Sequence, residues 1–138
     1  MEYGKTISLD LPFDEAVPRV KAAFKEQGFG ILTEIDIKAT LKEKIDADVD
    51  SYIILGACNP ELAKRALEIE PEIGLLLPCN VVVRQSEGKV LVHALDPGVM
   101  VSIPGRPELQ GIADEAGERV ANALKALGPD GVNPEEHA

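Results

Sequence analysis

The chain has 138 residues, of which 45% are hydrophobic and 28% are charged, and its formal net charge is −10 at pH 7. This length and composition are typical of one soluble globular domain with a substantial hydrophobic core. A strongly negative surface repels phosphate backbones and anionic lipids, so we expect neither nucleic acid nor membrane as a partner. No apolar run approaches the roughly 20 residues that a membrane-spanning helix needs.

The N-terminus and the cysteines indicate a cellular location. The first residues, MEYGK, lack the apolar segment of a signal peptide, which favours a cytoplasmic protein with reduced thiols. Two cysteines in a chain of this size do not form a disulfide framework. We expect a single domain over residues 1–128, followed by a flexible, acidic, Gly/Pro-rich tail over residues 129–138.

The first third of the chain predicts two strands with a helix between them. Apolar and polar residues alternate over residues 3–11 and again over residues 29–38, as in half-buried strands. Asp14 is a candidate N-cap of the intervening helix, which Gly28 ends. Residues 39–45 (ATLKEKI) predict a short helix.

The central stretch, residues 52–84, carries both cysteines. Its opening run YIILGAC predicts a strand buried on both faces. Asn59-Pro60 then predicts a helix start, with Asn as the N-cap and Pro in the first turn. Residues 73–77 are apolar but contain a glycine, and we expect them to be an extended approach to the next strand.

The last part of the chain predicts a hairpin and a closing helix. Two valine-rich runs, residues 80–85 and 90–95, flank the turn sequence SEGK at residues 86–89. Residues 99–103 predict a short edge strand, and residues 109–127 predict a long amphipathic helix. Together the elements predict an α+β fold, a mainly antiparallel sheet with helices packed on one face.

Three segments resemble the prokaryotic domain-of-unknown-function family 302. They are ILGACNPELAKRALEIEPEIGLLLPCNVVV (residues 54–83), FGILTEIDIKATLKEK (residues 29–44) and DPGVM (residues 96–100). The resemblance extends to about Leu127. It implies a TATA-binding-protein-like fold with a β-α-β4-α core and a homodimer, and it implies no established activity. Pro18 departs from the family pattern, which affects only the local geometry of the first helix.

Two Cys-Asn pairs are the candidate ligand-binding residues. Cys58 directly precedes a helix N-terminus, where the dipole and free amides favour a thiolate. Asn59 and Asn80 can present amides to a small anionic or carbonyl ligand. Each residue also has a structural interpretation: Cys58 as a small buried hydrophobic residue at the helix start, Cys79 as a residue at the start of a strand, Asn59 as a helix cap, and Asn80 as a strand-edge residue.

His93 is the fifth candidate, and its surroundings depend on the hairpin turn. A two-residue loop at Glu87-Gly88 pairs His93 with Val82. His93 then shares a sheet face with Asn80. A three-residue loop instead moves His93 to the face of Cys79, and only that arrangement produces a Cys/His cluster.

These observations leave the activity open. We predict a protein of unknown function that acts as a dimeric small-molecule or metal-binding module, with its site near the two Cys-Asn pairs. One alternative is a thiol-dependent redox or persulfide-handling enzyme with Cys58 as the nucleophile. The other is a purely structural or interaction protein. The sequence identifies no catalytic residue, no cofactor and no metal-ligand motif.

Overall fold

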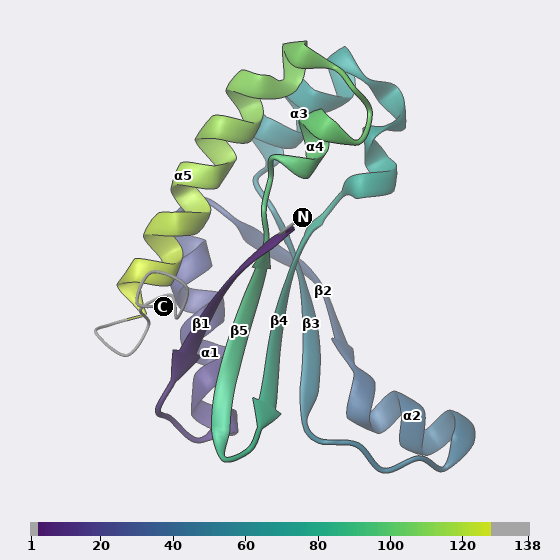
Figure 1. Cartoon of the computed structure of the whole chain (residues 1–138), viewed down its shortest axis with the longest axis vertical. Coiled ribbons are helices and arrows are strands. Elements are labelled where there is room, and N and C mark those ends of the chain that lie inside the picture. The colour runs from purple at the N-terminus through teal and green to yellow at the C-terminus, as the bar shows by residue number, and fades with distance from the viewer. Residues whose placement is uncertain (1–2, 128–138) are drawn as a thin grey trace.

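The computed structural model describes residues 3–127, which form a five-stranded sheet with helices on one face (Figure 1). The strands are β1 (Gly4–Leu9), β2 (Gly30–Asp36), β3 (Tyr52–Cys58), β4 (Cys79–Ser86) and β5 (Lys89–Leu95). The α-helices are α1 (Phe13–Glu26), α2 (Ile37–Ile45), α3 (Pro60–Ile69), α4 (Val99–Ser102) and α5 (Gln110–Ala126). Two 3-10 helices, η1 (Pro71–Leu76) and η2 (Pro107–Leu109), complete the chain. The predicted α+β fold is confirmed. The predicted tail over residues 129–138 lies outside the described residues.

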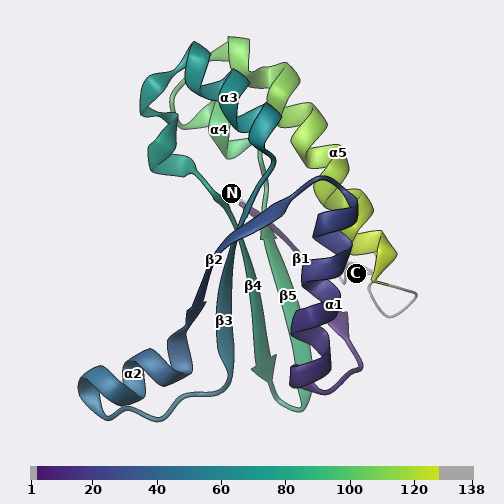
Figure 2. The same cartoon turned by 180° about the vertical axis from the view of Figure 1, so that it is seen from behind.

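All neighbouring strands are antiparallel, in the order β1-β5-β4-β3-β2. Helices α1 and α5 lie side by side on one face of this sheet, as the view from behind shows (Figure 2). Helices α3 and α4 lie beyond the end of the sheet where β3 ends. The opposite sheet face, which we call the open face, carries no helix and faces the viewer in Figure 1.

The main hydrophobic core lies between the sheet and the two long helices. Every second residue of the central hairpin points into it, because side chains alternate across a strand. The buried residues of β4 and β5 are Cys79, Val81, Val83, Val90, Val92 and Ala94. On the helix side, Phe24 of α1 makes an edge-to-face contact with Phe29, with ring centroids 5.6 Å apart. A second cluster, which includes Leu62, Ile73 and Leu109, packs α3, η1 and η2 together.

Two of the expected segments are helical instead of extended, and those predictions were wrong. Over Pro71–Leu76 the chain forms η1, started by the Glu70 carboxylate, which accepts a hydrogen bond from the Glu72 amide at 3.1 Å. Val99–Ser102 forms α4 instead of an edge strand. Its turn begins where the Asp96 side chain accepts a bond from the Gly98 amide at 2.9 Å.

The predicted N-cap of the first helix was also wrong. The carbonyl of Pro12 accepts bonds from the amides of Glu15 and Ala16, both at 3.0 Å, so the helix begins at Phe13. Asp14 therefore lies inside the first turn, where its negative charge still interacts favourably with the helix dipole.

The turn between β4 and β5 is the two-residue loop Glu87-Gly88. Both residues have positive φ, 50° and 81°, as a type I′ hairpin turn requires. Ser86 consequently pairs with Lys89, and His93 pairs with Val82. This pairing sets the sheet face of every side chain in the hairpin.

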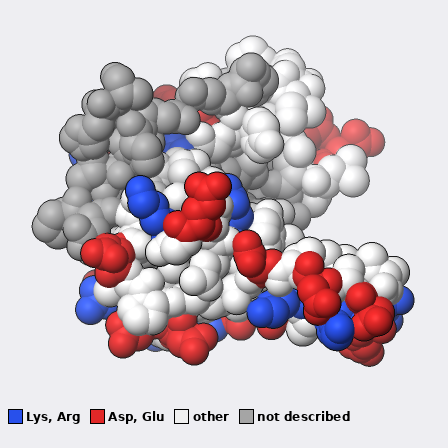
Figure 3. All heavy atoms as spheres, turned by 60° about the horizontal axis from the view of Figure 1, so that its bottom comes forward, with Lys and Arg blue, Asp and Glu red and all other residues white. Residues whose placement is uncertain are grey.

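Helix α2 extends away from the lower end of β2 and β3, as both views show (Figures 1 and 2). None of its nine residues is buried. Acidic and basic side chains are interspersed over this end of the molecule (Figure 3). Within residues 3–127, no helix combines the length and apolar character that a membrane crossing requires.

Candidate functional site

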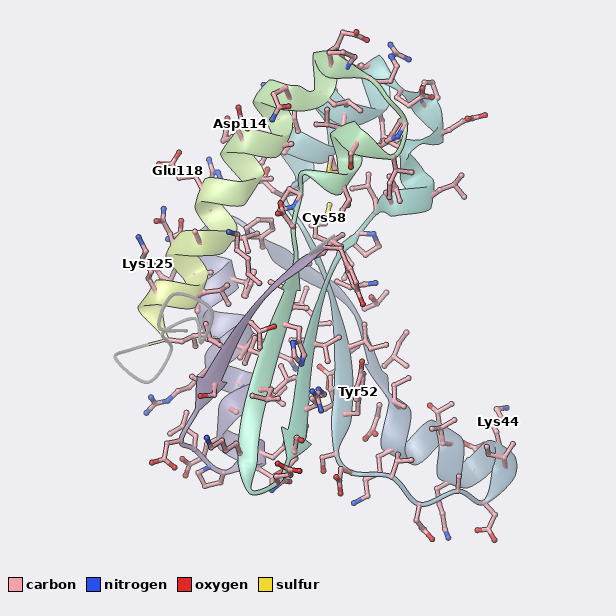
Figure 4. The ribbon with its side chains drawn as sticks, in the orientation of Figure 1. Lys44, Tyr52, Cys58, Asp114, Glu118 and Lys125 are labelled. Atoms are coloured by element: carbon pink, nitrogen blue, oxygen red, sulfur yellow. The ribbon has the colours of Figure 1, made fainter. Side chains whose placement is uncertain are left out.

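The two cysteines line one small crevice where β3 meets α3. Cys58 lies at the upper end of β3 in Figure 4, and Cys79 is the partner of the preceding residue, Ala57. The remaining walls are almost entirely apolar and include Phe29, Leu62 and Met100. The cavity volume is about 20 Å³, which is room for about one water molecule. The crevice is therefore too small for an organic ligand.

Burial keeps both thiols protonated. Removal from water raises the pKa of Cys79 to about 11, with a further contribution from Cys58. Burial also raises the pKa of Cys58. Burial is the largest cause of both shifts, and it acts against the lowering of a thiol pKa that a helix N-terminus favours.

The two asparagines do not converge on one ligand. The Asn59 side chain caps α3, accepting a hydrogen bond from the Leu62 amide at 3.1 Å. Asn80 is exposed on the open face, whereas its neighbour Cys79 points into the protein. The structure thus brings Cys58, Asn59 and Cys79 to one corner and places Asn80 on the other side of the sheet.

His93 lies on the open face as well, at the centre of a hydrogen-bonded chain. Arg84 donates its Nε–H to His93 Nε2 at 2.9 Å. Because an arginine nitrogen is always a donor, Nε2 must accept and the ring proton must reside on Nδ1. That Nδ1–H in turn donates to Thr6 Oγ1 at 2.8 Å. Burial, followed by the charge of Arg84, lowers the pKa of His93 and keeps the ring neutral.

The three hydrogen-bonded side chains line a groove with a volume of about 470 Å³. Its lining residues come from β1, β3, β4 and β5: Tyr3, Gly4, Thr6, Tyr52, Val82, Arg84 and His93. Tyr52 marks it in Figure 4, on the side of the sheet turned toward the viewer. The volume lies within the range of small-molecule sites, and the walls combine apolar area with a few polar groups.

Thr6, Tyr52 and Arg84 were not among the residues predicted from the sequence. Arg84 follows from the two-residue loop, because it lies two positions from Val82, the partner of His93. Thr6 depends on the pairing of β1 with β5, which joins residues 87 positions apart. Among residues 3–127, no group of three or more His, Cys, Asp or Glu side chains is arranged to hold a metal ion.

The comparison with protein families identifies the chain. The profile of the domain of unknown function DUF302 matches residues 5–127. The chain belongs to the DUF302 family. A solved structure, an uncharacterised conserved DUF302 protein from Bacillus stearothermophilus, is similar with a TM-score of 0.86 and 28% sequence identity. The match covers 93% of this chain and 100% of that one. A search of curated proteins finds no match. Family membership thus supports the DUF302 fold and assigns no activity.

Proposed function

We propose that the protein is a cytoplasmic, non-enzymatic module that binds a small molecule in the groove of the open face. The observation that carries this proposal is the chain from Arg84 through His93 to Thr6 in the groove of about 470 Å³. Polar groups held in fixed positions within a mostly apolar concavity are typical of ligand sites. His93 is the one sequence-predicted candidate that lines this groove.

The cysteine corner supports a binding function less well. Its crevice holds about 20 Å³, and its thiols are shifted away from the reactive thiolate form. A soft metal ion would need ligands beyond Cys58 and Cys79, since structural zinc is four-coordinate. A thiol-dependent enzyme would need a nucleophile with a lowered pKa.

Thermal denaturation with a metabolite panel tests the proposal. Ligands that raise the melting temperature of the parent protein should lose most of that effect in His93→Ala and keep it in the matched control Cys58→Ala. If no compound stabilises the parent, or if its effect depends on Cys58 and not on His93, the groove is not the binding site.

We also propose that the protein is a homodimer and that α2 takes part in the interface. Ile37, Leu41 and Ile45 recur every four residues, so they form one apolar stripe along α2. Ile45 is 69% exposed, and Leu32 of β2, the strand that leads into the helix, is 65% exposed. An isolated helix of nine residues is marginal in water. A second copy would cover this stripe and stabilise the helix.

The size of α2 indicates how much of the sheet the interface includes. One side of a nine-residue helix, about 13.5 Å long and about 10 Å wide, presents roughly 135 Å². A stable interface buries about 800 Å² per partner. The interface must therefore extend over the neighbouring open face of β2 and β3. The groove lies mainly toward the other edge of the sheet, where β1 is located, and shares only Tyr52 with the open face of β3.

Light scattering coupled to size-exclusion chromatography tests the dimer. Ile45→Glu should shift the protein to a monomer, because it places a charge in the apolar stripe. Ala39→Glu introduces the same charge on the polar side of α2 and should leave the dimer intact. A monomeric parent protein, or equal behaviour of the two variants, would contradict the assignment.

A further inference from the structure

We infer that the groove takes an organic carboxylate, which the guanidinium group of Arg84 binds end-on and the Thr6 hydroxyl also contacts. This inference rests on the proposed binding function and specifies its ligand class. It follows from which donors the chain of hydrogen bonds uses and which it leaves available.

Arg84 has two donor nitrogens to offer. Its Nε–H is committed to His93, so the Nη1 and Nη2 groups at the tip remain. Arg84 forms no ion pair with any Asp or Glu among residues 3–127, although six other basic side chains in that part of the chain do: Lys21, Lys42, Lys64, Arg65, Arg106 and Arg119. The Nη1 and Nη2 groups, which we call the fork, can donate two parallel hydrogen bonds to the two oxygens of a carboxylate. His93 holds the guanidinium group in place, and Arg84 lines the groove.

Thr6 supplies a further donor. Because Thr6 Oγ1 accepts the proton of His93 Nδ1, its own hydroxyl proton is free to point elsewhere. The groove side is available to it, since Thr6 lines the groove. Arg84 donates a hydrogen bond to His93, and His93 donates one to Thr6. Because each bond polarises the next, the Thr6 hydroxyl becomes a stronger donor.

The charges of the site favour a monoanion over a phosphate. The groove lining contains one permanent positive charge, that of Arg84, because His93 is held neutral. A carboxylate neutralises that charge. A phosphate dianion would leave an excess negative charge on a protein whose net charge is already −10. The apolar surfaces of Tyr52 and Val82 favour a carboxylate attached to an apolar body.

The probes are benzoate, benzamide and phenyl phosphate, added to the full-length ¹⁵N-labelled protein and followed by NMR titration. Benzamide has the shape of benzoate without its charge. We expect benzoate to bind most tightly, with chemical-shift changes on β1, β4 and β5, and to weaken as salt is added. Arg84→Lys keeps the charge but removes the fork, and should weaken benzoate by about tenfold or more.

Two more variants complete the test. Thr6→Val should weaken benzoate binding, whereas Thr6→Ser, which retains the hydroxyl, should preserve it. Asn80→Ala is a control elsewhere on the open face and should have no effect. The NMR spectrum of each variant shows directly whether it has folded.

The inference fails if benzamide or phenyl phosphate binds as well as benzoate, or if Arg84→Lys binds benzoate like the parent. It also fails if none of the probes binds. In that case a His93-dependent ligand from the metabolite panel would preserve the proposed function without the carboxylate. The inference also fails if Arg84→Gln dissociates the dimer and leaves benzoate binding unchanged. The Nη groups of Arg84 would then bind a carboxylate side chain of the second copy instead of a ligand.

Discussion

The thiol of Cys79 should be almost unreactive in the folded protein, and this expectation can be tested quantitatively. Its side chain is 8% exposed, and its pKa rises from 9.0 to about 11. At pH 8, a rise of about two pKa units lowers the thiolate population about 100-fold. Since the thiolate is the nucleophile, alkylation should slow as the thiolate population falls, although a more basic thiolate is also more nucleophilic and offsets part of this loss. Limited access of the reagent slows alkylation further.

The measurement uses Cys58→Ser, which leaves Cys79 as the single cysteine. Iodoacetamide at pH 8 is added to the native protein and, in parallel, to the protein unfolded in urea, and intact-mass spectrometry follows the adduct. We expect the native rate to be lower by some tens of fold or more, because burial, the larger cause of the raised pKa, remains when the contribution of Cys58 is removed. In the matched Cys79→Ser variant, the half-buried Cys58 should be slowed less, because burial raises its pKa without closing it off from solvent.

A native Cys79 rate within about tenfold of the unfolded rate would refute this reasoning. It would mean that the crevice opens readily or that the N-terminus of α3 stabilises a thiolate more than burial destabilises it. A Cys58 that reacts faster than the unfolded thiol would have the same implication for its own site. The thiol-dependent enzyme would then become the better-supported function.

Three further predictions concern stability, measured by urea unfolding. Gly56→Ala should lower the free energy of unfolding by about 1–3 kcal/mol, because the new Cβ would lie 2.8 Å from Pro78 Cγ. In the control Gly111→Ala the new Cβ meets open space, so the free energy of unfolding should instead rise by up to about 1 kcal/mol. Asn59→Ala should lower it by about 1 kcal/mol through loss of the α3 cap, and an unchanged value would contradict the capping role. The pKa of His93 is lower in the folded protein than its unfolded value of 6.5, so the folded state favours the neutral ring. The stability that this provides is complete above pH 6.5 and is lost as the pH falls through the folded pKa. The His93→Gln variant should therefore lose less stability than the parent between about pH 7 and pH 5.

Local patterns were sufficient to predict where the five strands lie, but not how deeply each one is buried. The two valine-rich runs form β4 and β5, in which every second residue is buried from Cys79 to Val83 and from Val90 to Ala94. By contrast, β2 was predicted to be half-buried and has no buried residue, and β3 was predicted to be buried on both faces but has one face on the open side of the sheet. The cap of α3 was equally local, since Asn59 and the amide it accepts from are three residues apart. Such features are readable because all of the interacting groups lie within one short segment.

The two segments wrongly predicted as extended are ones where distant packing decides the conformation. Val99 and Met100 belong to residue types that also suit strands, yet both are buried in α4. Tertiary burial overrides such weak preferences. Ile73 similarly is 1% exposed within η1, packed in the second hydrophobic cluster. No local pattern in residues 71–76 or 99–103 indicates which surface will cover them.

The hairpin turn explains why the site was only partly predictable. The sequence allowed a loop of two or three residues, and the two choices put His93 on opposite faces. The structure has Glu87 at a φ of 50°, a conformation that is uncommon for a residue other than glycine. Propensity therefore could not select this turn. The apolar face of β5 does require it, since a one-residue shift would exchange buried Val92 with His93.

The sheet itself separates the two kinds of chemistry that the sequence placed together. Cys79 and Asn80 are adjacent in the chain, but consecutive strand residues point to opposite faces. The Cys79 thiol therefore lies on the buried side of the sheet, and the Arg84–His93 chain lies on the open side. Substitutions on one side should leave the other unaffected: Cys79→Ser should change alkylation without changing benzoate affinity, and Arg84→Lys should do the reverse. If Cys79→Ser alters benzoate binding while the fold is retained, the two faces are coupled through β4, and the cysteines act on the ligand site through this strand.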